Sequence, residues 1–201
     1  MSNKVSIIEY HYVRDLKNSR YPEIKGLEVG LFKEQLLYMS KHYQVIRMED
    51  LIEAVRFKKQ LPENALLLTF DDGYLDHFEF VFPILTELGI QGSFFPPARA
   101  IQEHQVLDVN KIHFILASVK NKEQIVKDIF SLLDIHRAEY FLEENRYYYN
   151  KLAQKSRFDP KEVAFIKLIL QRELPEKLRN IIVNDLFKKY VSPDEKSFSR
   201  E

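Results

Sequence analysis

The 201-residue sequence contains no cysteine. Disulfide bonds, thiolate nucleophiles and sulfur-ligated metal ions are therefore excluded from any account of its chemistry. This absence does not fix a compartment, because reducing and oxidising compartments both hold cysteine-free proteins. Long apolar runs are missing as well. No stretch reaches the roughly 18 apolar residues that a membrane-spanning helix requires, so no membrane span is expected.

An excess of charge of one sign is also absent, since 30 Lys and Arg residues balance 30 Asp and Glu residues. A general attraction to nucleic acid or to anionic membranes usually needs a basic excess, so we expect neither as a partner. A neutral ligand such as a sugar remains compatible with this balance. The apolar stretch at the N-terminus is interrupted by Glu9 and His11 and is too short for the core of a signal peptide. We therefore expect a cytoplasmic protein.

Residues 5–98 alternate between strand-like and helix-like patterns. A run of β-branched and aromatic residues predicts a strand over 5–13, and Leu66–Phe70 is an unbroken apolar run typical of a strand buried on both faces. Alternation of this kind predicts parallel strands joined by helical crossovers. The remaining expected strands are 44–48 and 92–95, and the expected helices are 31–43, 49–57 and 74–88.

The pattern changes near residue 100. From Asp108 onward only helical periodicity is found, with helices expected over 160–173 and 175–190 and a further helix start at Ser192–Glu195. We therefore divide the chain into an α/β part at residues 1–99 and a helical insertion or appendage at residues 100–201. The run Tyr147–Tyr149 has two interpretations, a surface that stacks on sugars or a packed helix face.

The segment Leu66–Gly73 ends an apolar strand in two adjacent carboxylates and a glycine. Ligands in α/β folds bind at the carboxyl ends of the strands. Adjacent carboxylates at such a place repel one another unless a cation or a proton offsets their charge. Asp71 and Asp72 are therefore candidates for catalysis or metal binding. The alternative is that Asp72 caps the next helix and that Asp-Gly forms the turn.

Residues 5–98 contain several motifs in a characteristic order: Tyr10–Val13, the helix with Phe32, Gln35 and Leu36, Thr69–Gly73, Pro83–Leu85 and Gly89–Phe95. Together they resemble the polysaccharide deacetylase family. The resemblance implies an irregular parallel (β/α) barrel, here only a partial one with a C-terminal helical region, and a divalent metal ion, usually zinc. It implies that Asp71 is the general base and Asp72 a metal ligand.

Further members of the site are expected beside the two aspartates. His11 follows the first strand, so in a barrel it lies at the same rim, where it could bind substrate, orient a carboxylate or serve as an extra ligand. Gly73 and Tyr74 directly follow the aspartates, and we place both with His11 as second-rank or substrate-binding residues. A lone histidine at a strand end is also compatible with a structural role, and His77 is a weaker candidate near the same rim.

The chain departs from the family pattern in its histidines. The family completes its metal site with a His-Ser/Thr-Xaa-Xaa-His motif, whereas no two of the six histidines here are three or four residues apart. A single carboxylate does not hold Zn²⁺ tightly, so zinc is expected to be weakly bound or absent. Either the protein continues beyond Glu201 to the missing histidines, or it is a relative that has lost catalysis.

The expected function is hydrolysis of N- or O-acetyl groups on a polysaccharide or its precursor, with an acetylated polysaccharide or oligosaccharide as partner. The first alternative is a non-catalytic carbohydrate-binding or assembly protein of the same fold. The second is a Mg²⁺ enzyme, which needs further carboxylates at the rim. A partial barrel leaves two strand edges unpaired, and from this we expect a homodimer in which two copies cover one another's edges.

Overall fold

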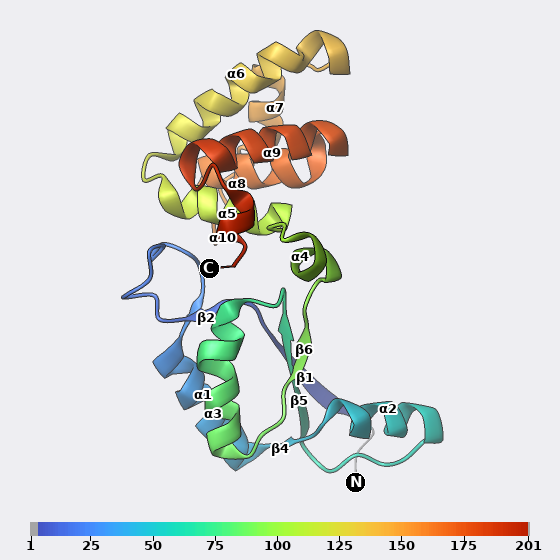
Figure 1. Ribbon diagram of the computed structural model, residues 1–201. Coiled ribbons are helices and arrows are strands. Elements are labelled where there is room, and N and C mark those ends of the chain that lie inside the picture. Colours follow the sequence, from blue (N-terminus) through green and yellow to red (C-terminus); the bar gives the residue numbers. More distant parts are fainter. Residues whose placement is uncertain (1–3, 201) are drawn as a thin grey trace. The chain divides into compact units, whose positions relative to one another are not determined.

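The computed structural model describes residues 4–200, which form two compact units (Figure 1). The first unit runs up to Arg20 and continues over Lys25–Glu103. The second comprises Tyr21–Ile24 and His104–Arg200. Among the described residues, no helix combines the length and the apolarity that crossing a lipid bilayer demands.

A small parallel sheet forms the centre of the first unit, with β5 (Ala65–Asp71) as its middle strand. Strand β1 (Val5–Tyr10) pairs with β5 along its whole length, from Val5 opposite Ala65 to Tyr10 opposite Phe70. On the other side, β4 (Gln44–Val45) pairs with the beginning of β5 and β6 (Ser93–Phe95) with its end. A second pair, β2 (Val13–Arg14) with β3 (Leu27–Glu28), is also parallel.

The two faces of this sheet are packed differently. One face carries Tyr10, Leu68 and Phe70, whose side chains are buried against residues of the helices on that side. The other face carries Ala65 and Leu67, which are covered near the start of β5 by apolar residues of the α2 segment. Figure 1 shows α1 and α3 on one side of the sheet and α2 on the other. The helices are α1 (Val29–His42), α2 (Met48–Phe57), the π-helix η1 (His77–Val81), α3 (Phe82–Leu88) and α4 (Ala98–Glu103).

Two of the expected elements are divided in the structure. The strand expected over 5–13 breaks at His11, because the carbonyl oxygens of His11 and Tyr12 accept hydrogen bonds from His77 Nε2 and Leu27 N instead of continuing the ladder with β5. The helix expected over 74–88 is interrupted by the π-helix η1 at His77–Val81 and continues as the α-helix α3 from Phe82. Strand β4 is also shorter than expected, because helix α2 begins at Met48.

Over residues 104–200 the second unit consists of helices joined by loops, as the periodicity predicts. Its buried residues include Ile115, Ile129, Phe165 and Ile182, each with no exposed surface. The predicted fold class, a parallel α/β part followed by a helical region, is confirmed. The elements are α5 (Asp108–Ser118), α6 (Lys122–Tyr140), α7 (Asn145–Leu152), α8 (Lys161–Leu168), the π-helix η2 (Ile169–Glu173), α9 (Glu176–Tyr190) and α10 (Glu195–Phe198).

A buried ammonium group joins three helices of the second unit. Lys111 on α5 is 4 % exposed, and its Nζ lies 2.6 Å from Asn184 Oδ1 on α9 and 2.8 Å from Glu195 Oε1 on α10. The same Glu195 oxygen accepts a hydrogen bond from Val106 N at 2.9 Å. Because a buried charge without partners is costly, these contacts fix the position of α10 against α5 and α9.

Replacing Lys111 with Met removes the ammonium group while filling most of its volume. We expect Lys111→Met to lower the free energy of unfolding by about 1–3 kcal/mol, because Asn184 and Glu195 lose a charged donor in a buried place. Urea denaturation followed by circular dichroism measures this. The control is Lys196→Met on the exposed side of α10, which should stay within about 0.5 kcal/mol of the unsubstituted protein. Equal effects of the two substitutions would contradict the structural role of Lys111.

Candidate functional site

The carboxyl ends of β1 and β5 lie side by side and carry the polar residues of the candidate site. Asp71 is the last residue of β5, and His11 directly follows β1. Because the strands are parallel and Glu9 pairs with Thr69, Glu9 and Asp71 project from the same face of the sheet. The structure therefore brings together Asp71 and His11, as expected for one rim, and adds Glu9 to them.

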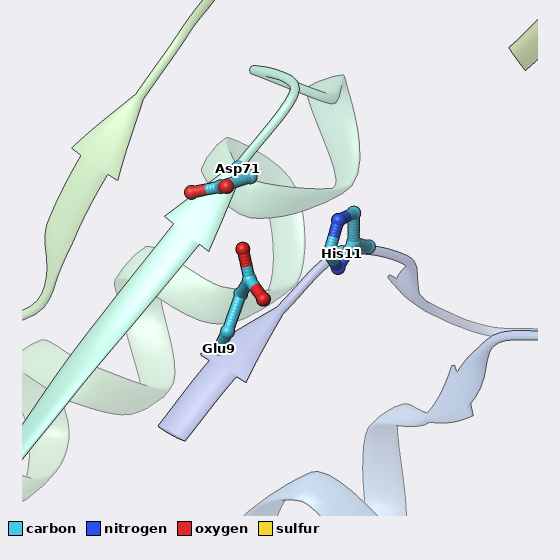
Figure 2. Close-up of side chains that lie close together, drawn as sticks. All are labelled: Glu9, His11 and Asp71. Atoms are coloured by element: carbon cyan, nitrogen blue, oxygen red, sulfur yellow. The ribbon is translucent and has the colours of Figure 1, made fainter. Parts of the chain in front are cut away.

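Glu9, His11 and Asp71 form a group that could hold a metal ion. Each offers one ligand atom, and these three atoms all lie within 4.8 Å of one another. Figure 2 shows the Glu9 carboxylate between the end of β5 and the His11 ring. Glu9 and His11 are exposed and Asp71 is half-buried, so the group is open to solvent. Within residues 4–200, it is the one group of three such side chains close enough to share an ion.

The Asp71 carboxyl group affects the protonation of Glu9. A hydrogen bond with the Asp71 side chain raises the pKa of Glu9, and the negative charge of Asp71 raises it further. His11 acts in the opposite direction on the pKa of Glu9. The charged groups that act on this pKa are thus two aspartates, which raise it, and one histidine, which lowers it. A cation bound at this place would reduce the repulsion between the two carboxylates.

Asp72 lies outside this cluster of three. Its backbone is left-handed, with φ of 71°, and its Oδ2 accepts a hydrogen bond of 2.6 Å from the Tyr74 hydroxyl. The Tyr74 ring stacks on Tyr12 at 4.3 Å between centroids. Burial raises the pKa of Tyr74, so its hydroxyl stays protonated and can donate to Asp72. The two adjacent aspartates consequently have different partners.

Gly73 is required by the turn between Asp72 and the following helix. Its φ is +64°, in the left-handed region that side chains rarely adopt. A Cβ at this position would also lie 2.7 Å from Pro96 Cβ, closer than atoms approach. The turn that carries Asp72 and Tyr74 therefore packs directly against the segment that follows β6. Gly73 offers no side chain for chemistry, and its contribution to the site is this close approach.

Buried residues after the turn connect it to the end of β1. His77 is 3 % exposed, and its Nε2 lies 2.7 Å from the His11 carbonyl oxygen, so Nε2 carries the hydrogen and donates. One residue earlier, the Asp76 carboxylate accepts a hydrogen bond of 2.7 Å from Arg14 Nε. Burial lowers the pKa of His77 and favours its neutral form. His77 thus positions the backbone of His11 rather than facing a ligand.

Glu9 is the residue of this site that the sequence did not predict. In the sequence it looks like an interruption of an apolar strand. A signal was available in the spacing, because residues two apart on a strand share a face and Glu9 precedes His11 by two. The pairing register with β5 places Glu9 beside Asp71, and register is not visible in the sequence of one strand.

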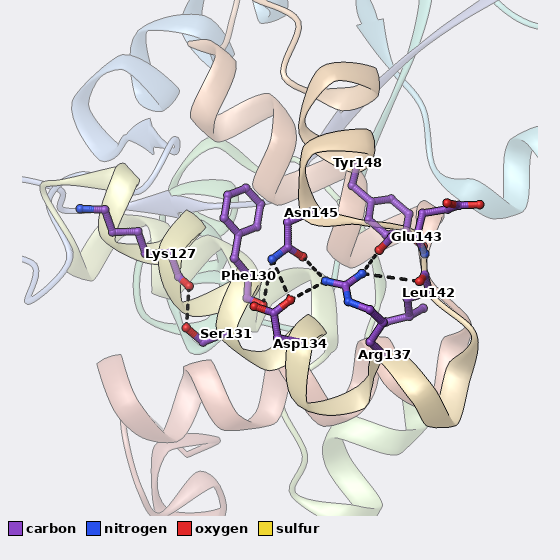
Figure 3. A network of polar contacts seen from close by, with 9 residues as sticks. All are labelled: Lys127, Phe130, Ser131, Asp134, Arg137, Leu142, Glu143, Asn145 and Tyr148. Atoms are coloured by element: carbon purple, nitrogen blue, oxygen red, sulfur yellow. Dashed lines mark hydrogen bonds and ion pairs between the residues drawn. The ribbon is translucent and has the colours of Figure 1, made fainter.

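The tyrosine run in the second unit is mostly packed. Tyr148 is buried, and the Tyr149 ring contacts Phe165 at 5.2 Å between centroids, so these two rings form a helix face. Tyr147 is half-exposed. Figure 3 shows Tyr148 at the margin of a polar network in which Arg137 bridges Asp134 and Asn145. This network joins α6 to α7, and the interpretation as a packed face holds for Tyr148 and Tyr149.

A zinc ion held through Asp72, as the family resemblance implies, does not fit the residues around Asp72 in this chain. Asp72 is one carboxylate, already bonded to Tyr74, and structural or catalytic zinc sites use at least three protein ligands. The donor set of Glu9, His11 and Asp71, with two carboxylates and one imidazole, does fit such an ion. Among residues 4–200, the group of side chains that could hold an ion without further ligands therefore includes Asp71 and not Asp72.

Comparison with known proteins supports the resemblance noted in the sequence. The family model described as polysaccharide deacetylase matches residues 58–131, which include Asp71, Asp72 and Gly73. The poly-beta-1,6-N-acetyl-D-glucosamine N-deacetylase of Escherichia coli (strain K12) is 36 % identical over 80 residues, or 39 % of this chain. The chain spans 12 % of the length of that relative.

Two solved structures are similar over part of the chain. One is a de-N-acetylase from Aggregatibacter actinomycetemcomitans, with 27 % identity, a TM-score of 0.41, and coverage of 46 % of this chain and 37 % of that one. The other is IcaB from Ammonifex degensii, with 27 % identity and a TM-score of 0.42. The similar region covers 48 % of this chain and 39 % of that one.

The requirement for glycine at position 73 can be tested against a second glycine with the same backbone angle. Gly73→Ala should lower the free energy of unfolding by about 1–3 kcal/mol, because it combines a left-handed backbone with the contact to Pro96. Gly89 also has φ of +64°, but a Cβ added there would meet no atom within 4 Å, so Gly89→Ala should cost only the backbone strain. Urea denaturation of both variants measures the difference. Equal losses would show that Pro96 does not constrain the turn.

The burial of His77 predicts a dependence of stability on pH. Its pKa is lowered in the folded state, so its contribution to stability is complete above the ordinary pKa of 6.5 and is lost as the pH falls through the folded value. His77→Gln keeps an amide donor for the His11 carbonyl and cannot gain the proton. We expect the free energy of unfolding to fall more between pH 7 and pH 5 in the unsubstituted protein than in His77→Gln. Parallel pH profiles from urea denaturation would show that His77 is not protonated on unfolding.

Proposed function

We propose that this protein, whose N-terminal part is related to polysaccharide deacetylases, acts in removing acetyl groups from a polysaccharide or its precursor. In the reaction, water attacks the acetyl carbonyl, the bond from the carbonyl carbon to nitrogen or oxygen breaks, and acetate and a free amine or hydroxyl are released. The observation that carries this proposal is the match of residues 58–131 to the polysaccharide deacetylase family, with both aspartates in place at the end of a buried parallel strand.

Asp71 is proposed as the general base. It ends β5 at the edge of the sheet where ligands of α/β folds bind, and it is only half-buried, so a water molecule can reach its carboxylate. Its role would be to accept the proton of the attacking water. His11, on the neighbouring strand end, lies close enough to orient that carboxylate or to contact the substrate.

Asp72 is proposed as the metal ligand that the family resemblance implies. Tyr74 holds its carboxylate by a hydrogen bond, and the backbone is left-handed at both Asp72 and Gly73. A bound zinc ion would supply polarisation of the acetyl carbonyl and of water. Asp72 alone does not make a zinc site, so this role applies only where histidine ligands are provided together with it.

A non-catalytic carbohydrate-binding or assembly protein of the same fold is the second candidate. The absence of a His-Xaa-Xaa-Xaa-His pair from the sequence favours it, because the aspartates by themselves cannot assemble the family's metal site. Under either proposal the partner is an acetylated polysaccharide or oligosaccharide. The expected homodimer and the expected cytoplasmic location also stay predictions.

The reading frame that encodes this chain distinguishes the two candidates. Sequencing beyond Glu201 tests for a histidine pair, and the protein from the whole frame is then assayed for acetate release from acetylated β-linked glucosamine oligomers with Zn²⁺ present. We expect acetate release that falls at least about a hundredfold in Asp71→Asn, because the base is lost. Asp72→Asn should also abolish activity.

The matched control for these substitutions is Asp15→Asn, a loop residue whose carboxylate accepts hydrogen bonds from Asn18. It should leave acetate release unchanged. Saturable binding of the acetylated oligomer without acetate release, by the protein of the whole frame, would establish the non-catalytic candidate. Acetate release that survives Asp71→Asn would refute the role proposed for Asp71.

A further inference from the structure

The geometry points to a divalent-cation site formed by Glu9, His11 and Asp71, which we propose takes an ion of the zinc class with Asp71 as a ligand. The proposal rests on the three side chains and their positions, and it does not require the deacetylase function. This site is distinct from the one in which Asp72 is proposed as a ligand, because Asp72 does not belong to the group of Glu9, His11 and Asp71.

The arrangement of donor atoms supports this site. Zinc binds imidazole nitrogen and carboxylate oxygen at about 2.0–2.2 Å in tetrahedral geometry, which brings the donor atoms to within about 3–4 Å of one another. The three donor atoms are already within 4.8 Å. Glu9 and His11 are exposed, so rotation of these side chains can close the remaining gap without disturbing the core.

The supporting structure fixes two of the three ligands to rigid elements. Glu9 and Asp71 belong to paired strands, and the ladder between β1 and β5 sets their separation. His11 leaves the ladder, but its carbonyl oxygen is held by buried His77. Sites built on paired strands are better preorganised than sites on loops, so little order has to be gained on binding.

Charge favours a cation at this place. The Glu9 and Asp71 side chains project from one face of the sheet, and their donor oxygens lie within 4.8 Å of each other. A divalent ion bound between them would offset the repulsion of two negative charges. The imidazole of His11 selects against Mg²⁺ and Ca²⁺, which take oxygen ligands, and in favour of Zn²⁺, Co²⁺ or Ni²⁺.

Occupation of this site would have a consequence for the proposed chemistry. A carboxylate that coordinates a cation is less available to accept a proton from water. Asp71 could therefore serve as a ligand or as the general base, but not as both at full effect. Excess zinc would then inhibit a deacetylase that depends on Asp71.

The test measures metal binding directly and needs no activity. The 201-residue chain is stripped with chelator and titrated with Zn²⁺ alone by calorimetry, and with Co²⁺ alone by visible absorption. We expect one ion per chain, and at least about a tenfold loss of affinity in each of Glu9→Gln, His11→Gln and Asp71→Asn. Circular dichroism checks that each variant keeps its fold.

Two matched controls show whether the binding is specific to these three side chains. Glu34→Gln changes an exposed carboxylate on α1, and His42→Gln changes an exposed histidine on the same helix; neither should alter the affinity by more than about twofold. Mg²⁺ at the same concentration should not compete. Binding that is lost in either control, binding that survives Glu9→Gln, or no one-to-one binding at all would each overturn the proposal. An absence of acetate release from the whole reading frame would instead refute the proposed function and leave the metal site untouched.

Discussion

The pairing of β1 with β5 is the constraint on which the candidate site depends. It joins residues about sixty positions apart in the chain, in a register that sets Glu9 opposite Thr69 and Tyr10 opposite Phe70. A shift of one residue would exchange the two faces, placing carboxylates in the core and aromatic rings in solvent. The burial of Tyr10 and Phe70, whose rings stack at 5.3 Å, makes that exchange costly and so fixes the register.

The same register gives the sheet two unlike faces at its carboxyl end. On one face the rings of Tyr10 and Phe70 are buried among residues of the neighbouring helices. On the other, Glu9 is exposed and Asp71 half-buried, and Ile7 on the same face of β1 is 56 % exposed. Carboxylates in contact are tolerated there because solvent, a proton or a cation can reach them. Burial on one face thus makes an open, charged site possible on the other.

Much of this arrangement could be predicted from the sequence. The apolar run Leu66–Phe70 identifies the central strand, and the rule that parallel strands end at one edge predicts the proximity of His11 to Asp71. The helical spacing of apolar residues by itself predicts that the chain from Asp108 onward is helical. These features are local, or follow from a general rule of topology, and so are readable from one sequence.

Other features depend on contacts that no local pattern encodes. The place of Glu9 in the site follows from pairing register, and the break of β1 at His11 follows from the hydrogen bond to His77. Asp72 bonds to Tyr74 and does not join the group that contains Asp71. This depends on the direction of its side chain in a left-handed turn. Lys111, which the sequence shows as one lysine among many, is recognisable only from its burial.

The π-helix η1 at His77–Val81 has a consequence for how this protein should be compared with its relatives. A π-helical turn accommodates one residue more than an α-helical turn over the same rise. A homologue with a regular helix here would be one residue shorter between Gly73 and Gly89, and a different side chain would then face the carbonyl at the end of the first strand. An alignment of this segment with a relative that has a regular helix here therefore needs a one-residue gap to keep His77 in register.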